Sequence, residues 1–347
     1  MHVEGPELQR LSVVIPSLNR AETLARTIDR IQQQTVSRET YEVLVINNNS
    51  TDHTQSVLSQ KVALYPNLRA FTQAKPGAAA TRNVGIQEAA GDLILFIDDD
   101  IFADQGLIEN HLNYHEKNDN ASVIGKVVYP WEQSTDPFLR YLRHRGIFEP
   151  YDLNSSLPID FSYYHTGNAS TSRKMLLEVG GFDEEFWKYG MEDIELGYRL
   201  ERKGCRNVAG PLAKASHEYF PTCRQFVDRC VQAGFSLGKL VDLHPELQTR
   251  FTNNCKCVRL LKRLHPVYRF LRSALDPICE GLIGWENRRG TGKINPLLDQ
   301  HYRWEIRYHF FLGYRDYVQS AESGRTTQQS PGEEGPEVPK FAIERHD

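Results

Sequence analysis

The sequence has no long apolar run: nowhere in its 347 residues do the roughly 18 consecutive apolar positions of a membrane-spanning helix occur. The opening residues, MHVEGPELQR, also lack the basic start and apolar centre of a secretory signal peptide. We therefore expect a cytoplasmic protein. Peripheral contact with the inner face of the membrane is left open for the C-terminal part of the chain.

Cysteine is scarce as well, with six in the chain, and no pair has the CxxC spacing of a zinc or redox site. Cys255 and Cys257 are the closest pair, but six reduced thiols are the simpler expectation in the cytoplasm. The net charge of −4 gives no sign of a nucleic-acid partner. The length suits one large domain with an appendage, or two domains.

What the sequence does contain is an alternation of strand-like and helix-like segments. Short apolar runs lie at 11–16, 41–47, 68–73 and 92–97. Helix-like segments follow the first three runs, and in the first of these Leu24, Ile28 and Ile31 recur at helical spacing after Asn19, the expected N-cap. Strands that alternate with helices of this length imply crossover connections and a mainly parallel sheet.

Three of these runs end in polar clusters, at 17–19, 47–49 and 98–100. The carboxyl ends of parallel strands meet at one edge of the sheet, where ligands bind in such folds. The last cluster is Asp98, Asp99 and Asp100, and no lysine or arginine follows it closely in sequence. We therefore expect an external counter-charge, and carboxylates suit Mg²⁺ or Mn²⁺. A solvated turn that caps a helix is the alternative.

Strand alternation predicts that Asp98 and Asp100 point to one side and Asp99 to the other. One carboxylate would then be available for the metal and another for a hydroxyl group of the ligand.

Four motifs, in order, resemble those of the family 2 glycosyltransferases: LSVVIPSLNR, VLVINNNSTD, KPGAAATRNVGIQEAAGDLILFIDDD and GGFDEEFWKYGMEDIELGYRLERKG. They span roughly residues 11 to 218. The resemblance implies a GT-A fold, with a Rossmann-like, mainly parallel central sheet and flanking helices. It also implies transfer of a sugar from a nucleotide diphosphate to an acceptor with inversion at the anomeric carbon.

The resemblance also assigns roles on the donor side. Pro16 and Ser17 would flank the base and ribose, and Asn47 stands where the family usually has an aspartate that accepts a hydrogen bond from the base. An amide oxygen can accept that bond, but without charge assistance. Arg82 would contact the nucleotide, its alternative being an arginine on a helix surface. Together with the polar strand ends, the resemblance gives the nucleotide-sugar-binding residues Pro16, Ser17, Asn19, Asn47, Asn49, Arg82, Asp98, Asp99, Gly167 and Asn168.

A second constellation lies in GGFDEEFWKYGMEDIELGYRL. The resemblance makes Asp193 the general base, with Glu192 beside it, and capping of a helix N-terminus is the alternative. Trp187 would be a platform for an acceptor sugar or, alternatively, a core residue. Asp100 would bind the metal, and His217, which follows a short strand-like run, would complete the metal site or be a packed or surface residue.

The C-terminal third of the chain has no motif of this kind. We expect a GT-A domain over 1–220, a helical appendage over 221–319 and a disordered tail over 320–347. Residues 256–275 combine basic and apolar side chains, which suits either an interfacial helix on anionic lipid or a pair of helices packed on the domain.

Other classes of protein fit less well. A nucleotidyltransferase should have a glycine-rich phosphate loop after its first strand, and IPSLNRAE has no glycine. A dehalogenase-type phosphatase would have its DxD motif at the first strand. We expect a metal-dependent inverting glycosyltransferase of polysaccharide or glycoconjugate biosynthesis, with Mn²⁺ or Mg²⁺, a UDP- or GDP-type donor and a glycan or lipid-linked acceptor. The alternative is a non-catalytic nucleotide-sugar- or glycan-binding relative, which should have lost the DxD motif or the acidic pair.

Overall fold

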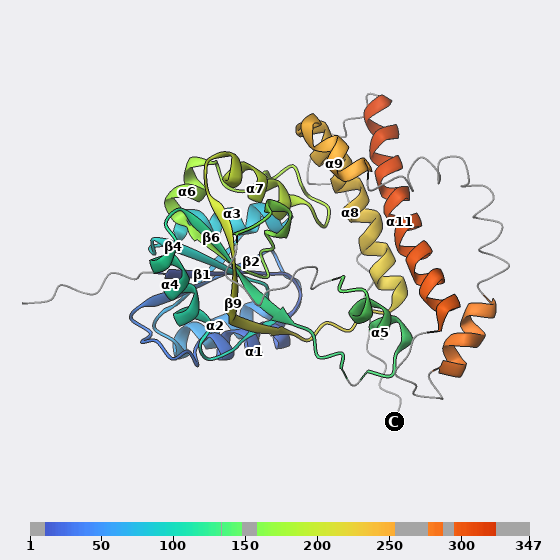
Figure 1. Ribbon diagram of the computed structural model, residues 1–347. Helices are drawn as coiled ribbons and strands as arrows, with labels where there is room; N and C mark the ends of the chain where they lie inside the picture. The colour runs from blue at the N-terminus through green and yellow to red at the C-terminus, as the bar shows by residue number, and fades with distance from the viewer. Residues whose placement is uncertain (1–10, 133, 148–157, 254–276, 287–294, 324–347) are drawn as a thin grey trace, which may run out of the picture.

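The computed structural model describes residues 11–132, 134–147, 158–253, 277–286 and 295–323. A sheet flanked by helices forms the N-terminal part, and longer helices from the C-terminal part lie beside it (Figure 1). The strands are β1 (Leu11–Ser17), β2 (Tyr41–Asn47), β3 (Leu68–Thr72), β4 (Leu93–Ile97), β5 (Ile101–Ala103), β6 (Ala121–Val128), β7 (Pro158–Ile159), β8 (Asn168–Ser172) and β9 (Arg206–His217). The α-helices are α1 (Ala21–Ile31), α2 (Thr54–Leu64), α3 (Ala78–Glu88), α4 (Leu107–Lys117), α5 (Pro137–His144), α6 (Arg173–Glu178), α7 (Glu192–Arg202), α8 (Cys223–Leu243), α9 (Gln248–Asn253) and α11 (Pro296–Glu322).

The strands lie in the order β3-β2-β1-β4-β8-β6-β9-β5, with β7 also paired to β9. β1 is parallel to β2 and β4, and β2 is parallel to β3. β8 is antiparallel to both β4 and β6, so the complete sheet is mixed. The mainly parallel sheet predicted from the sequence is thus confirmed, with antiparallel pairs only where later strands join.

Successive residues of the central strands are buried on opposite faces of the sheet. Val13 and Ile15 of β1 belong to a buried cluster with Leu24 of α1, and that cluster also includes residues of α2 and α4. Val14 belongs to a second cluster with residues of α3, α6 and α7. In Figure 1, α1 and α2 lie on one side of the sheet and α3, α6 and α7 on the other. Burial on both faces explains why these strands are continuously apolar in sequence.

The helices α8 and α11 run side by side in direct backbone contact (Figure 1). A Cβ atom added to Gly234 of α8 would lie 2.0 Å from the carbonyl oxygen of Phe310, and one added to Gly313 of α11 would lie 1.7 Å from that of Val231. Only glycine permits so close an approach. The helix α5 joins this pair through aromatic contacts, such as Phe138 against Tyr302 with ring centroids 5.1 Å apart.

The predicted division at residues 220 and 319 stays a prediction. α11 continues to Glu322, past the predicted start of the tail at residue 320. Just before that point, Tyr317 donates a hydrogen bond of 2.9 Å to Asp242 of α8. The predicted interfacial segment 256–275 and residues 324–347 lie outside the described residues. In the part of the chain that the structure describes, no helix has the length and apolarity needed to cross a membrane.

Candidate active site

The first two aspartates that follow β4 have different partners. Asp98 accepts a hydrogen bond of 2.8 Å from Nη2 of Arg82, a buried residue of α3. Asp99 is buried and accepts one of 2.7 Å from Oγ of Ser17, at the end of β1. The strand ends are therefore joined by direct contacts, as the parallel topology requires. The alternative that Arg82 is a helix-surface residue is wrong.

Arg20, in the turn before α1, lies beside the other two aspartates. Its guanidinium forms an ion pair with Asp100, and Nη1 lies 3.4 Å from Oδ1 of Asp99. We expected an external cation to neutralise the three carboxylates. This expectation was incomplete, because Arg20 and Arg82 are remote from the aspartates in sequence but supply two positive charges in the fold.

Burial raises the pKa of Asp99 to about 7, with Arg20 opposing the rise and Asp100 adding to it. Burial acts in the same direction on Asp100, but the adjacent His217 and Arg20 outweigh it and hold the pKa of Asp100 below its usual value. Of Asp99 and Asp100, Asp100 is therefore the carboxylate that stays ionised.

His217, the last residue of β9, faces Asp100. Its Nε2 atom lies 3.1 Å from Oδ2 of Asp100, but it is not aligned for a hydrogen bond and makes none to any described residue. A buried imidazole nitrogen and a carboxylate oxygen 3.1 Å apart could both bind the same divalent cation. No cluster of three or more histidine, cysteine or acidic residues that could hold a metal occurs among the described residues. These two residues would thus leave positions for phosphate oxygens, as Mg²⁺ and Mn²⁺ sites for nucleotides require.

At the start of α7, Glu192 is linked to the strand-end aspartates through Arg82. Nη1 of Arg82 lies 3.2 Å from Oε1 of Glu192, while Oε2 is buried without a hydrogen-bond partner among the described residues. Burial and the neighbouring charge of Asp193 raise the pKa of Glu192 to about 7, against the lowering effect of Arg82.

Asp193 is held from two directions. Its Oδ1 accepts a hydrogen bond of 2.8 Å from the backbone N–H of Ile194, and its Oδ2 lies 3.3 Å from Nδ1 of His165. Burial acts to raise the pKa of Asp193, but the hydrogen bond and charge of His165, with the charge of Arg82, lower it overall. The contact with Ile194 is local to the helix start, so the capping interpretation is compatible with the structure. The cap uses only Oδ1, and Oδ2 faces His165 instead.

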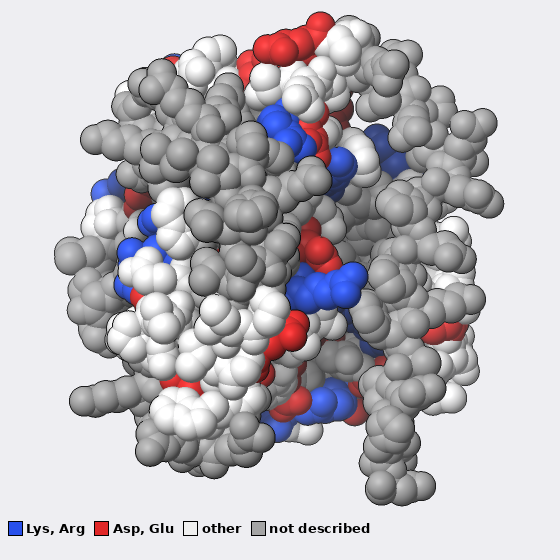
Figure 2. Space-filling model, turned by 90° about the vertical axis from the view of Figure 1, so that its right-hand side faces the viewer, with Lys and Arg blue, Asp and Glu red and all other residues white. Residues whose placement is uncertain are grey.

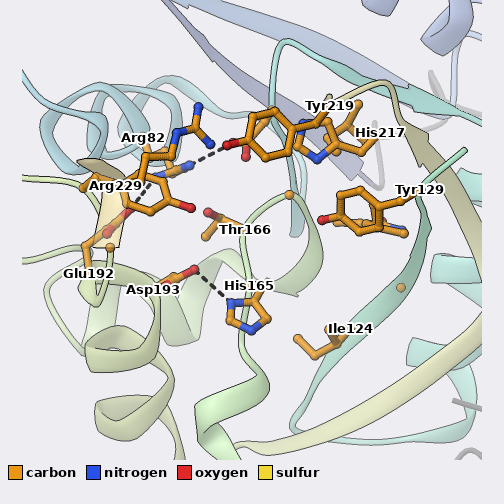
Figure 3. Close-up of a pocket in the computed structure, with 18 of the residues that line it drawn as sticks. Arg82, Ile124, Tyr129, His165, Thr166, Glu192, Asp193, His217, Tyr219 and Arg229 are labelled. Atoms are coloured by element: carbon orange, nitrogen blue, oxygen red, sulfur yellow. Dashed lines mark hydrogen bonds and ion pairs between the residues drawn. The ribbon is translucent and has the colours of Figure 1, made fainter. Parts of the chain in front are cut away.

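Several of these groups line one cavity of about 320 Å³ (Figure 3). Of the residues expected at the site, it is lined by Arg82, Asp98, Gly167, Asn168, Glu192, Asp193 and His217. The described lining does not include Pro16, Ser17, Asn19, Asn47, Asn49, Asp99, Asp100 or Trp187. Asp98, from the strand-end aspartates, and the acidic pair at the start of α7 therefore line the same cavity.

Asn19 joins the loop after β1 to the loop after β2, whereas Asn47 holds the turn in its own loop. Oδ1 of Asn19 accepts a hydrogen bond of 2.7 Å from the N–H of Thr51, and Oδ1 of Asn47 accepts one of 2.9 Å from that of Ser50. Asn19 has φ of 55° and is not the N-cap of α1, because Arg20 occupies that position. Asn49 also has φ of 55° and is exposed. The predicted base contact of Asn47 would compete with its own turn.

Asn168 lines the cavity, but its amide is already engaged within the protein. Oδ1 lies 2.8 Å from Nε2 of the buried His111, and Nδ2 donates to the carbonyl of Ala213 at 2.9 Å. A Cβ atom added to Gly125 would lie 2.2 Å from Nδ2 of Asn168, so this wall depends on the absence of a side chain there. Gly167 lines the cavity beside it.

Trp187 is not a core residue. Its side chain is 57% exposed, and its ring lies against Phe235 of α8 with centroids 6.2 Å apart. Pro16 is part of β1 and pairs with Ile46. The roles predicted for these residues toward substrates stay predictions.

Sequence reasoning missed several residues of the site: Arg20, Tyr129, His165, Thr166, Tyr189, Tyr219 and Arg229. Arg20 directly follows LN in the first motif, so its place in that motif was a usable signal. His165 precedes the expected Gly167–Asn168 pair by two residues. Arg229 gave no signal, because it lies on α8, beyond every motif.

Comparison with known proteins agrees with this geometry. The sequence matches glycosyl transferase family 2 over residues 12–180 and the N-terminal domain of galactosyltransferase over residues 153–221. It is 28% identical over 265 residues to the uncharacterized glycosyltransferase YfnE of Bacillus subtilis. That alignment covers 63% of this chain and 67% of YfnE. It is 32% identical over 220 residues to the validoxylamine A glucosyltransferase of Streptomyces hygroscopicus subsp. jinggangensis. That alignment covers 56% of this chain and 52% of the glucosyltransferase. The chain thus spans only half to two thirds of the length of these two relatives.

Among solved structures, the mannosyltransferase PcManGT from Pyrobaculum calidifontis, in complex with GDP-Man and Mn²⁺, matches with a TM-score of 0.59 at 16% identity. The match covers 90% of this chain and 88% of PcManGT. At this identity the likeness concerns the fold, and it confirms the GT-A fold predicted from the sequence. Residues 12–180 of the chain form a glycosyl transferase family 2 domain.

Proposed function

We propose that the protein is a metal-dependent, inverting glycosyltransferase that moves a sugar from a nucleotide diphosphate sugar to a hydroxyl group of a glycan or lipid-linked acceptor. The main support is that Asp98, from the strand-end aspartates, and Asp193, from the first turn of α7, line one cavity. The named relatives are glycosyltransferases, and PcManGT was solved with GDP-Man and Mn²⁺. UDP- and GDP-linked sugars are both candidate donors.

In this proposal Asp193 is the general base. Inversion needs a base on the face of the sugar opposite the departing diphosphate, and the acceptor hydroxyl attacks from that face. A carboxylate oxygen of Asp193 receives the hydroxyl proton as the new bond to the anomeric carbon forms. The bond from that carbon to the diphosphate oxygen breaks, and its electron pair stays on that oxygen. His165 and the N–H of Ile194 hold the carboxylate in place and keep it ionised.

Arg82 connects the donor and acceptor sides of the site. It contacts Asp98 and Glu192 at once, so it fixes the distance between the end of β4 and the start of α7. Asp100 and His217 would hold Mn²⁺ or Mg²⁺, which when bound would neutralise charge on the departing diphosphate. Asp99 is instead engaged by Ser17.

The alternative is a non-catalytic relative that binds nucleotide sugars or glycans. Retention of Asp98, Asp100, Glu192 and Asp193 favours the enzyme, because a binding protein does not need a general base.

Calorimetric titration of UDP and GDP, with Mn²⁺ and with a chelator, tests the proposal. We expect one nucleotide to bind more tightly with Mn²⁺, and we expect Asp100→Ala to remove that gain. Equal affinity with and without the metal would remove the metal from the proposal. Binding of a nucleotide sugar without transfer to any of a panel of glycan and lipid-linked acceptors would favour the non-catalytic relative.

A further inference from the structure

Arg229 of α8 is a positive charge in the cavity wall with no carboxylate in ion-pair contact among the described residues. The other arginine of the described lining, Arg82, is shared between two carboxylates. Arg229 instead contacts aromatic rings: Cζ lies 4.6 Å from the ring centroid of Tyr219 and 5.1 Å from that of Tyr189. A guanidinium whose faces lie on aromatic rings keeps its N–H groups, which point outward in its own plane, for a ligand.

The two rings come from different elements, which restricts how the guanidinium can move. Tyr219 follows β9, whereas Tyr189 lies in the loop that leads to α7. An arginine fixed in this way loses less conformational entropy when it binds a ligand.

Arg229 is connected to the proposed metal side of the cavity. The ring of Tyr219 also stacks on that of His217, with centroids 5.2 Å apart and an interplanar angle of 22°. Figure 3 shows Arg229, Tyr219 and His217 along one edge of the cavity, with Asp193 and His165 across from them. An anion near Arg229 would thus lie on the side of the proposed metal ligands and away from the proposed base.

The charges of the cavity wall favour this position for an anion. Asp98, Glu192 and Asp193 repel a negatively charged ligand, and Arg82 is already balanced by two of them. Among the described residues of the wall, Arg229 is the arginine that remains for a negatively charged ligand.

We infer that Arg229 binds the diphosphate of the nucleotide-sugar donor, on the side of the cavity where the proposed metal ligand His217 lies. This inference rests on the proposed function. The planar, forked guanidinium matches two phosphate oxygens. The diphosphate gains one negative charge when its oxygen keeps the electron pair of the broken sugar bond, so the contact strengthens as the sugar departs. Because α8 begins after residue 221, Arg229 lies outside both family matches.

The test compares Arg229→Met with Arg224→Met, which removes an exposed arginine from the same helix. Calorimetry with Mn²⁺ would measure binding of UDP, UMP, GDP and GMP to each full-length protein. We expect Arg229→Met to weaken binding of the diphosphate by about tenfold or more, and that of the monophosphate much less. Arg224→Met should bind like the wild type, and Arg229→Lys should recover part of the loss.

Wild-type affinity of Arg229→Met for the diphosphate would overturn the inference and leave the proposed function intact. If this variant binds the nucleotide normally but has a raised KM for a phosphorylated acceptor, Arg229 binds the acceptor and the diphosphate assignment is wrong. Equal losses for diphosphate and monophosphate, together with a lowered melting temperature, would show a purely structural role and would also overturn it. If the wild type binds no nucleotide, the proposed function fails, and this inference fails with it.

Discussion

Replacing Asp193 by asparagine separates proton transfer from capping at the start of α7. Asparagine keeps the shape of the side chain and an oxygen that can accept the 2.8 Å hydrogen bond from the N–H of Ile194. It removes the negative charge and with it the capacity to take a proton. We expect the transfer rate to fall by about 10² to 10⁴, the usual cost of losing a general base.

The free energy of unfolding of the variant should change little, for two reasons. The pair with His165 is lost, but the imidazole is 51% exposed, and pairs with an exposed partner are worth less than about 1 kcal/mol. The charge of Asp193 also contributes to the raised pKa of Glu192. Without that charge Glu192 ionises more readily and pairs better with Arg82, which offsets part of the loss.

The assay measures single-turnover transfer with saturating donor, beside donor affinity and melting temperature. Glu201→Gln, an exposed change on the same helix, is the control and should behave as the wild type. If Asp193→Asn transfers sugar at a near wild-type rate, Asp193 is only a cap and the base has to be sought at Glu192. A loss of stability above about 3 kcal/mol would instead show that the carboxylate is needed for folding.

Three further predictions concern stability. Gly313→Ala would force a Cβ atom against a carbonyl of α8 and should lower the free energy of unfolding by about 1–3 kcal/mol, as measured with denaturant. The control Gly281→Ala, whose new Cβ atom would have nothing within 4 Å, should be neutral or stabilising. Equal effects of the two changes would contradict the close helix contact. Gly125→Ala should cost a similar amount, and an unchanged melting temperature would show that Asn168 moves freely aside. Burial, with the charge of His115, lowers the pKa of His111 to about 3, so below its ordinary value of 6.5 only the unfolded state gains this proton. His111 alone should therefore lower the free energy of unfolding by about 1.4 kcal/mol for each pH unit between 6.5 and 3, and a pH dependence of stability that is unchanged in His111→Gln would refute this.

Local sequence patterns predicted the elements that hold the site. The apolar run before Asp98 is a buried strand, and the acidic pair before Ile194 begins a helix, because both follow from residues adjacent in sequence. Parallel strand order then brings Ser17 into contact with Asp99, which the coincidence of polar strand ends anticipated.

The partners of these residues could not be predicted in the same way. Arg20 reaches Asp100 across 80 positions, and Arg82 reaches Glu192 across 110. Such contacts depend on how the sheet and helices pack, and no periodicity records them. The base contact of Asn47 stays a prediction, and its sequence position did not reveal that its Oδ1 also accepts a hydrogen bond from the backbone of its own turn.

Arg20 has a consequence for how the protein is made. Because it already neutralises part of the charge at the end of β4, this region of the fold has a counter-charge of its own before any metal ion binds. Under the proposed function, folding and metal loading would then be separate events, and a cell short of manganese or magnesium would still accumulate folded protein. The supply of the ion would then decide how much of that protein is active.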